Sequence, residues 1–238
     1  MSRDAQAALR DKLRTENQFI DSLSRLLRNG VNFQNRQLEL ALIGHYNRTF
    51  DGFSRSYQDK HNIRMPKFQR LTMRDYLQGE FERRANRQAK LISDNSKRIW
   101  EKIQNMDLPP AEKQAMFQFR MGARSPVISS TETEWGAERT KLREVQFLQG
   151  GPESDNGTKR WDVVGDQLMR DHHADASGQT VPLDDAFSVG GEKLMHPGDP
   201  DLGASASNLV NCRCSLFYSI DPRYLTRSSS YTKFSSAN

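Results

Sequence analysis

The sequence predicts an α+β fold, with long helices in the N-terminal half and a small β-rich module, stabilised by its loops, in the C-terminal half. Two observations carry this prediction. Apolar residues recur at helical spacing up to about residue 148, which indicates amphipathic helices. From Gly150-Gly151 onward the chain is rich in Gly, Pro, Asp and Ser, and its apolar runs are short, as is typical of strands joined by long loops.

The first two predicted helices cover residues 4–28 and 35–60. In the first helix, four leucines and Ile20 form one apolar stripe, and Asn29-Gly30 is a typical helix stop. In the second helix, the stripe runs from Leu38 to Tyr57 and is rich in aromatic residues. Such a stripe indicates a core, or a contact surface for a partner, rather than a cofactor site.

Prolines divide the next part of the chain. Pro66 interrupts the helical pattern, and a long helix is predicted from Thr72 to Met106. Its start is indicated by Thr72 as a cap, with the acidic Asp75 three residues later. Asp107-Leu-Pro-Pro110 ends this helix, because a pair of prolines suits the start of the next one.

Beyond these prolines the sequence predicts two further helices. The first is short and covers residues 110–121, and a loop follows at Arg124-Ser-Pro126. The second covers residues 127–148, where Glu and Arg residues recur at the three- and four-residue spacing that supports a helix.

In the C-terminal half, three short apolar runs predict strands. These are Trp161–Val164, Leu183–Val189 and Ser215–Ile220, and a short helix is expected at Asp166–His172. The serine-rich end, residues 221–238, is expected to be a flexible tail.

The charge distribution divides the chain in the same way as the fold. Residues 1–125 hold 24 Lys and Arg against 14 Asp and Glu, whereas residues 126–238 hold 11 against 16. The basic half indicates contact with nucleic acid or another polyanion, and the alternative is a set of Arg-rich helices that only face water. No RNP, zinc-finger or P-loop signature accompanies the basic residues, so we expect phosphate contact without sequence reading.

Several classes of protein are excluded by composition. No apolar run is long enough to span a membrane, so we expect no membrane contact, and the N-terminal residues have no apolar stretch of the kind that forms a secretory signal. With 2 Cys in 238 residues, a disulfide scaffold is excluded as well.

Four residues are candidate metal ligands: Cys212, Cys214, His173 and His196. Thiolate and imidazole groups suit a borderline metal such as zinc. Two cysteines separated by one residue would point to opposite faces of a strand, so only a turn would bring both to one ion. The alternatives are two small buried cysteines beside histidines paired with carboxylates, and a nucleophilic cysteine activated by a histidine.

The loops of this half are also acidic. A hard-metal site is one interpretation of these acids, and solvated loop residues are the other. The acids concerned are Asp166, Asp171, Asp175, Asp184 and Asp185.

Several short motifs follow one another in order through this part of the chain. They are Thr131-Glu132, Lys159-Arg-Trp161, Asp166 with Arg170 and His173, Gly178 with Val181-Pro-Leu183 and Phe187, Gly191 to Pro200, and Asn211-Cys-Arg-Cys214. This ordered combination resembles the phage head morphogenesis family, the Mu F-like and SPP1 gp7-like minor head proteins. The resemblance covers residues 75–220 and is strongest over 158–216, so residues 1–65 lie outside it.

The resemblance implies a minor head (capsid) protein of a tailed bacteriophage, made late in infection. Such proteins act in head morphogenesis, DNA packaging or genome ejection near the portal. The implied partners are the portal protein and the major capsid protein, and packaged double-stranded DNA, bound without sequence specificity, is a further candidate. The implied location is the virion, inside the capsid near the portal vertex, after synthesis in the host cytoplasm.

We expect no enzymatic activity and no cofactor, with zinc as the open alternative. Two rival functions remain open. One is a non-virion DNA-binding packaging factor, and the other is a metal-dependent enzyme that uses the His/Cys/Asp cluster.

The resemblance also implies how the chain is divided and which residues matter. Residues 1–65 would be an N-terminal helical adaptor segment, 66–149 the helical part and 150–220 the β-rich part of the head morphogenesis domain. A structural polar network around the cysteines is expected from Thr131, Glu132, Trp161, Asp166, Arg170, His173, Asn211 and Arg213. Contacts with DNA or a partner are expected from Arg83, Arg84, Arg87, Lys97 and Arg98.

Overall fold

A computed structural model of the chain confirms the predicted α+β class. It describes five stretches: residues 3–28, 35–61, 65–151, 156–165 and 169–219. The tail expected at 221–238 and the network residue Asp166 lie outside the described residues.

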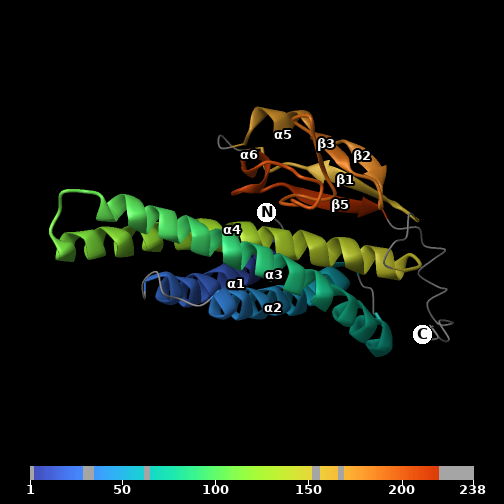
Figure 1. Cartoon of the computed structure of the whole chain (residues 1–238). Coiled ribbons are helices and arrows are strands. Elements are labelled where there is room, and N and C mark those ends of the chain that lie inside the picture. The colour runs from blue at the N-terminus through green and yellow to red at the C-terminus, as the bar shows by residue number, and fades with distance from the viewer. Residues whose placement is uncertain (1–2, 29–34, 62–64, 152–155, 166–168, 220–238) are drawn as a thin grey trace, which may run out of the picture.

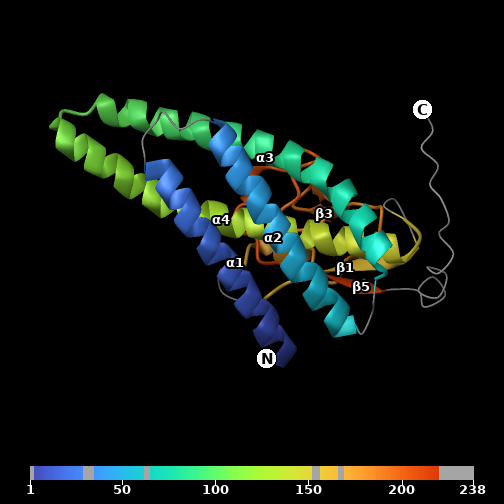
Figure 2. The same cartoon turned by 90° about the horizontal axis from the view of Figure 1, so that it is seen from below.

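Four long helices form the larger part of the protein. They are α1 (Arg3–Arg28), α2 (Asn35–His61), α3 (Lys67–Gln104) and α4 (Pro110–Leu148). Helices α1 and α2 lie side by side and pack across the longer hairpin formed by α3 and α4 (Figures 1 and 2). The end of the hairpin where α3 passes into α4 extends beyond the other elements (Figure 1).

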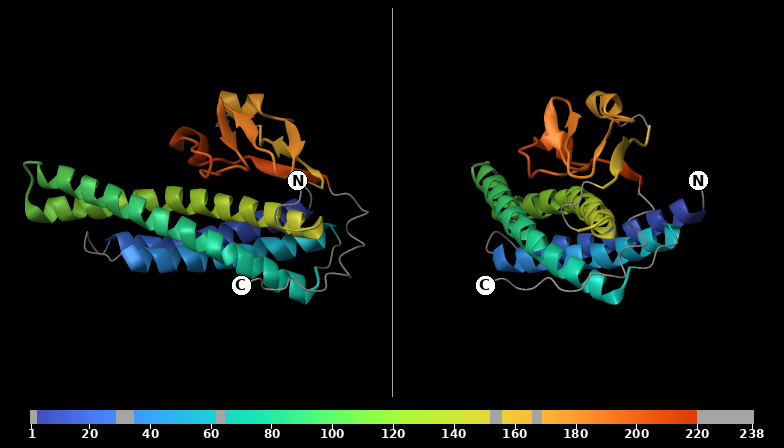
Figure 3. Two further views of the ribbon diagram at one scale, coloured as in Figure 1. Left: turned by 45° about the vertical axis from the view of Figure 1, so that its right-hand side comes forward. Right: turned by 90° about the vertical axis from the view of Figure 1, so that its right-hand side faces the viewer.

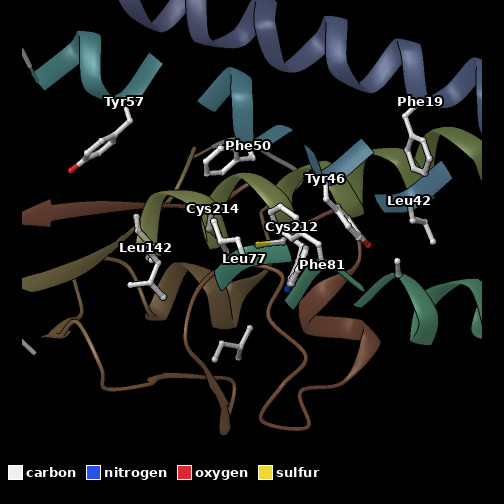
Figure 4. Packing of buried hydrophobic residues seen from close by; sticks show 14 of the residues in the cluster. Phe19, Leu42, Tyr46, Phe50, Tyr57, Leu77, Phe81, Leu142, Cys212 and Cys214 are labelled. Carbon is white, nitrogen blue, oxygen red and sulfur yellow. The ribbon is translucent and has the colours of Figure 1, made fainter. Parts of the chain in front are cut away.

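Apolar side chains of all four helices form the core, and most of the stripe predicted from Leu38 to Tyr57 belongs to it. In α1, Leu23 and Leu27 of the predicted stripe are buried, but Leu13 is 47% exposed, and the buried Phe19 was not part of the prediction. Figure 4 shows Phe19 of α1 with Tyr46 and Phe50 of α2 among the buried side chains. The Tyr46 ring packs edge-on against Trp135 of α4 at 5.0 Å between ring centroids and lies 5.5 Å from Phe81 of α3. The buried aromatic residues of α2 are therefore core rather than a partner surface.

Helix α3 begins at Lys67, directly after Pro66, and not at the predicted Thr72. The Thr72 hydroxyl donates to the Phe68 carbonyl at 3.1 Å, so it bonds back into the helix instead of capping its end. The proline supplies the helix start, because its fixed φ, −54° here, suits the position before the first turn.

Helix α4 is continuous through Pro126, whereas the sequence predicted a loop there between two helices. Pro126 lies on the exposed side of α4. The carbonyl that loses its N–H partner belongs to the half-exposed Gly122, where water can replace the missing donor. The buried face of the helix continues on both sides of the proline, at Met121 and Ser129, so packing maintains the helix.

The C-terminal module contains two small sheets and two short helices. Its elements are β1 (Thr158–Asp162), α5 (Asp171–Asp175), β2 (Thr180–Pro182), β3 (Phe187–Val189), β4 (Glu192–Leu194), α6 (Ala206–Leu209) and β5 (Ser215–Ser219). Strand β1 pairs antiparallel with both β2 and β5, which gives the order β2-β1-β5, and β3 and β4 form a separate hairpin.

Three predictions for this module need correction. The strand predicted at Trp161–Val164 is β1 at Thr158–Asp162, and Val163 and Val164 lie after it. Only Phe187–Val189 of the predicted strand Leu183–Val189 is a strand, because Asp184-Asp185 forms a turn, as adjacent acids often do. The short helix predicted at Asp166–His172 lies at Asp171–Asp175 instead.

Helix α4 is the central element of the fold. Helices α1, α2 and α3 pack against it, and the C-terminal module covers its other side (Figures 1 and 3). Every residue from Thr131 to Thr140 is therefore buried, a run that includes three glutamates and Arg139. Charges buried in this way must find partners on the neighbouring elements.

Glu132 of α4 and Arg84 of α3 form one such pair. The Arg84 Nε and Nη2 groups donate to the two carboxylate oxygens at 3.0 Å each, and the Tyr46 hydroxyl donates to Oε2 at 2.6 Å. The side chains of Glu132 and Arg84 are both only 3% exposed. Arg84 therefore does not lie on the DNA or partner surface predicted from the sequence.

Glu144, further along α4, is buried with neutral hydrogen-bond partners. The Ser54 hydroxyl and the Gln58 amide donate to its Oε1 atom at 3.0 and 2.8 Å. Its Oε2 atom has no hydrogen-bond partner among the described residues. Burial raises the pKa of Glu144 to about 7, and the two hydrogen bonds oppose this shift only in part.

We predict that Glu144→Gln relieves a pH-dependent loss of stability. The carboxyl ionises near pH 4.5 in the unfolded chain, whereas burial holds its pKa at about 7 in the folded protein. As the pH rises through this window, the unfolded state releases a proton that the folded state retains. The folded state thereby loses about 3 kcal/mol, from about 1.4 kcal/mol per pKa unit, and glutamine avoids this loss because it cannot ionise.

Urea unfolding between about pH 4.5 and about pH 8 measures this effect. We expect the stability of Glu144→Gln relative to wild type to rise by about 3 kcal/mol over that range. Glu112→Gln, at an exposed position of the same helix, is the control and should show no such trend. Parallel pH profiles for Glu144→Gln and wild type would contradict the assignment.

Candidate metal centre

His173 is held in a buried position by aromatic contacts. It lies on α5 and is 2% exposed. Its ring packs edge-on against Trp161 of β1 at 5.9 Å between centroids, and Trp161 packs in turn against Phe187 of β3 at 5.2 Å. These contacts tie α5 to both sheets and fix the position of the imidazole.

A turn brings both cysteines to His173. Cys212 and Cys214 lie in the irregular segment just before β5, and Asn211 ahead of them has a left-handed φ of 52°, which asparagine tolerates better than most residues. The Nδ1 atom of His173 is 3.2 Å from the Cys214 Sγ atom and 3.6 Å from the Cys212 Sγ atom. The turn that the Cys-x-Cys spacing required is therefore present.

These three side chains fit the dimensions of a zinc site. The three ligand atoms lie within 4.8 Å of one another, and all three residues are buried. A tetrahedral zinc ion with Zn–S about 2.3 Å and Zn–N about 2.0–2.1 Å has N···S edges of about 3.5–3.6 Å. The observed distances of 3.2 and 3.6 Å are close to this value, so little movement would be needed to hold an ion.

A second layer of hydrogen bonds orients the imidazole. The His173 Nε2 atom lies 3.1 Å from the Asn208 side-chain oxygen, which only accepts, so the ring proton belongs on Nε2. Nδ1 then presents its lone pair to the sulfur atoms. Asn208 is itself held by the Val189 carbonyl and the Glu192 carboxylate, at 3.2 and 2.5 Å. A metal-binding histidine ordinarily has this kind of support.

The two thiols differ in acidity. Neither cysteine is in a disulfide, and a hydrogen bond from the Cys212 thiol to the Cys214 sulfur lowers the pKa of Cys214. The same hydrogen bond, together with burial, raises the pKa of Cys212. Cys214 is thus the first of the two to become a thiolate, the form that binds metals and reacts as a nucleophile.

The cavity beside the cluster is small. Its volume is about 20 Å³, which suffices for a water molecule or a single ion. It is lined by Val164, Met169, Arg170, His173, Asn211, Arg213 and Cys214. An organic substrate does not fit, so the geometry suits a fourth metal ligand better than a catalytic reaction on a metabolite.

Two residues of the predicted polar network hold the turn that carries the cysteines. Arg170 donates through Nη2 to the Val210 carbonyl. On the other side, the Asn211 backbone N–H donates to the Thr131 hydroxyl of α4 at 3.3 Å. The turn is therefore fastened both to the segment before α5 and to the central helix.

The structure separates other predicted residues from this cluster. Glu132 belongs to the ion pair with Arg84 between α3 and α4. His196 lies outside the cluster, with its ring Nδ1–H donating to the Pro197 carbonyl at 2.9 Å. Burial holds the pKa of His196 well below its usual range, so this histidine is neutral and supports the Pro197-Gly198 turn.

The sequence reasoning missed Asn208 and Glu192, which orient His173. Asn208 belongs to no motif, and Glu192 lies within the Gly191 to Pro200 motif, where nothing singles it out as a partner of a histidine. The remaining residues predicted to contact DNA or a partner, Arg83, Arg87, Lys97 and Arg98, lie on exposed positions of α3.

In comparisons with known proteins, no family model, no curated protein and no solved structure matches the chain. The interpretation of the site rests on its geometry: three convergent ligands, an oriented imidazole and room for one small ligand.

We predict that His173→Ala destabilises the protein by about 1–3 kcal/mol even after treatment with a chelator, because it leaves the Asn208 oxygen and two thiols without their partner. Urea unfolding measures the change. Asp175→Asn, at an exposed position of the same short helix, should change stability by less than about 0.5 kcal/mol. Equal unfolding midpoints for the two variants would refute a structural role for His173.

Proposed function

We propose that this chain is a minor head protein of a tailed bacteriophage, which acts through structural contacts with the portal and capsid in head morphogenesis, DNA packaging or genome delivery. The observation that carries the proposal is the convergence of the family-like motifs. Trp161, His173 and the Cys212–Cys214 segment meet in one cluster, and Asn211 bonds to Thr131 of α4. The motifs thus act together as a joint between the helices and the C-terminal module.

A structural role accounts for this joint better than catalysis. Cys212 and Cys214 are 2% and 4% exposed, and the adjoining cavity has a volume of about 20 Å³. A nucleophilic thiol needs access to its substrate, which this burial denies. The cluster instead connects α5, the segment before β5 and α4.

The helices supply the contact surfaces in this proposal. The far end of the α3–α4 hairpin extends beyond the rest of the protein (Figure 1). Phe119, in the first three turns of α4, is 76% exposed. We assign portal or capsid contact to this end and DNA contact to the exposed basic residues of α3. Among the described residues, no helix is long and apolar enough to cross a bilayer.

Zinc is the second element of the proposal. The ligand distances and the hydrogen bond from His173 to Asn208 favour one ion held by His173, Cys212 and Cys214. Bound there, zinc would cross-link α5 to the segment before β5. The ion would stabilise the folded protein, as in other structural zinc sites, and its fourth coordination position would face the small cavity.

We predict about one zinc ion per chain in protein purified without chelator. Atomic spectroscopy measures the content, and Cys214→Ser should lose most of the metal because it removes a thiolate ligand. His172→Ala is the matched control, since His172 adjoins the cluster without being a ligand. Wild-type protein that stays free of zinc after incubation with it and repurification would eliminate the metal from the proposal.

We predict that the chain is present in purified virions at a few to a few dozen copies per portal ring. Quantitative mass spectrometry of virions from the source phage measures the copy number. Hundreds of copies would indicate a shell or decoration protein instead. Absence from virions with presence in the lysate would contradict the minor head protein and favour the free packaging factor or the enzyme.

A further inference from the structure

A second cavity lies where the helices meet the C-terminal module. It has a volume of about 240 Å³ and is separate from the cysteine cluster. Its lining comes from three places: Glu80, Arg83 and Arg87 of α3, Trp135 and Arg139 of α4, and Asp201 from the turn after β4. The cavity is complete only when the C-terminal module is docked on the helices.

Positive charge is in excess around this cavity. Asp201 accepts from Arg87 Nη2 at 2.7 Å through one oxygen and from Arg139 Nη2 at 3.1 Å through the other. Glu80 accepts from Arg139 Nε at 2.8 Å and from Arg143 Nη2 at 2.6 Å. Two carboxylates are thus shared among three guanidinium groups, and Arg83 adds a fourth.

The guanidinium groups around the cavity are held in place, but not all of their N–H groups have an acceptor. Arg139 is held at two points by Glu80, and its side chain is 10% exposed, so it is fixed as part of the wall. Arg87 is 55% exposed and donates to Asp201 through one nitrogen only. Arg83 lies exposed one turn before Arg87 and has no ion pair among the described residues. These two arginines have donors available for an incoming anion.

Trp135 completes the wall of this cavity. It lines the cavity, but it is 1% exposed, and its indole N–H, which has no hydrogen-bond acceptor among the described residues, is buried in the protein. The donors available to a ligand are therefore the arginine N–H groups.

We propose that this cavity binds a phosphate group, with Arg83 and Arg87 as the contacting cations and Arg139 as the fixed wall. Paired guanidinium groups match the oxygen geometry of phosphate, and the lining holds three arginines against two carboxylates, an excess of one positive charge that suits an anion. The ligand is either a phosphodiester of a nucleic acid backbone or a free phosphate. If the ligand is a nucleic acid backbone, this cavity is part of the DNA contact in the proposed function. Phosphate binding at the cavity does not itself require that the protein is a virion component.

Calorimetric titration of the full chain with inorganic phosphate tests the site directly. We expect saturable binding that is weakened about tenfold in Arg83→Gln and lost in the double variant with Arg87→Gln. Arg83→Gln breaks no ion pair, so it separates loss of binding from loss of fold. The control is the double variant of Arg25→Gln and Arg160→Gln, which removes the same charge from exposed positions outside α3 and outside the cavity lining, and it should bind phosphate as wild type does.

Fluorescence anisotropy with a short DNA duplex then identifies the source. Two results together would support a nucleic acid backbone as the ligand. Inorganic phosphate competes with the duplex, and the slope of log affinity against log salt concentration falls by about two in the Arg83/Arg87 double variant. Phosphate binding without duplex binding supports a free phosphate. No saturable phosphate binding, equal binding by all the variants, or stronger competition by an acidic peptide than by phosphate would overturn the proposal. None of these results changes the virion copy number, which tests the proposed function separately.

Discussion

The rest of the structure depends on the buried ion pair between Glu132 of α4 and Arg84 of α3. Removing these two charges from water is costly, and their attraction balances that cost only if the geometry is close and the remaining lone pairs are satisfied. The two-point contact and the hydroxyl of Tyr46 meet both conditions. The positions of α2, α3 and α4 along one another are thereby linked. Sliding α3 or α4 would leave a buried charge unpaired, and sliding α2 would withdraw the Tyr46 hydroxyl from the carboxylate.

Glu138, less than two turns further along α4, fixes the position of the C-terminal module on this helix. It pairs with Lys141 and accepts the backbone N–H of Leu216 in β5 at 3.2 Å. Through Thr131, the same helix also holds the Asn211 turn that precedes the cysteines. The cluster of His173, Cys212 and Cys214 and the cavity beside Trp135 thus share one scaffold, since both are built on residues that α4 fixes.

Much of the fold could be predicted from the sequence, because a stripe of apolar residues at helical spacing reports which face must be buried. The effect of Pro126 could not, since it depends on whether the affected carbonyl faces water. Arg83, Arg84 and Arg87 are alike by residue type, yet a rotation of about 100° per residue turns Arg84 inward and leaves the other two outside. His173 and the cysteines were predicted from their chemistry, whereas their meeting depends on one left-handed asparagine and the support of Asn208.

The complete burial of residues 131–140 has a consequence for the order of folding. One side of this stretch is covered by α1, α2 and α3, which precede it, but the other is covered by residues up to β5, which leave the ribosome after it. While the chain is being made, α4 must therefore expose a strip of apolar and charged groups until the C-terminal strand arrives. Contacts so distant in sequence form slowly, so a chain that stops early would be a target for chaperones or proteases rather than a smaller working protein.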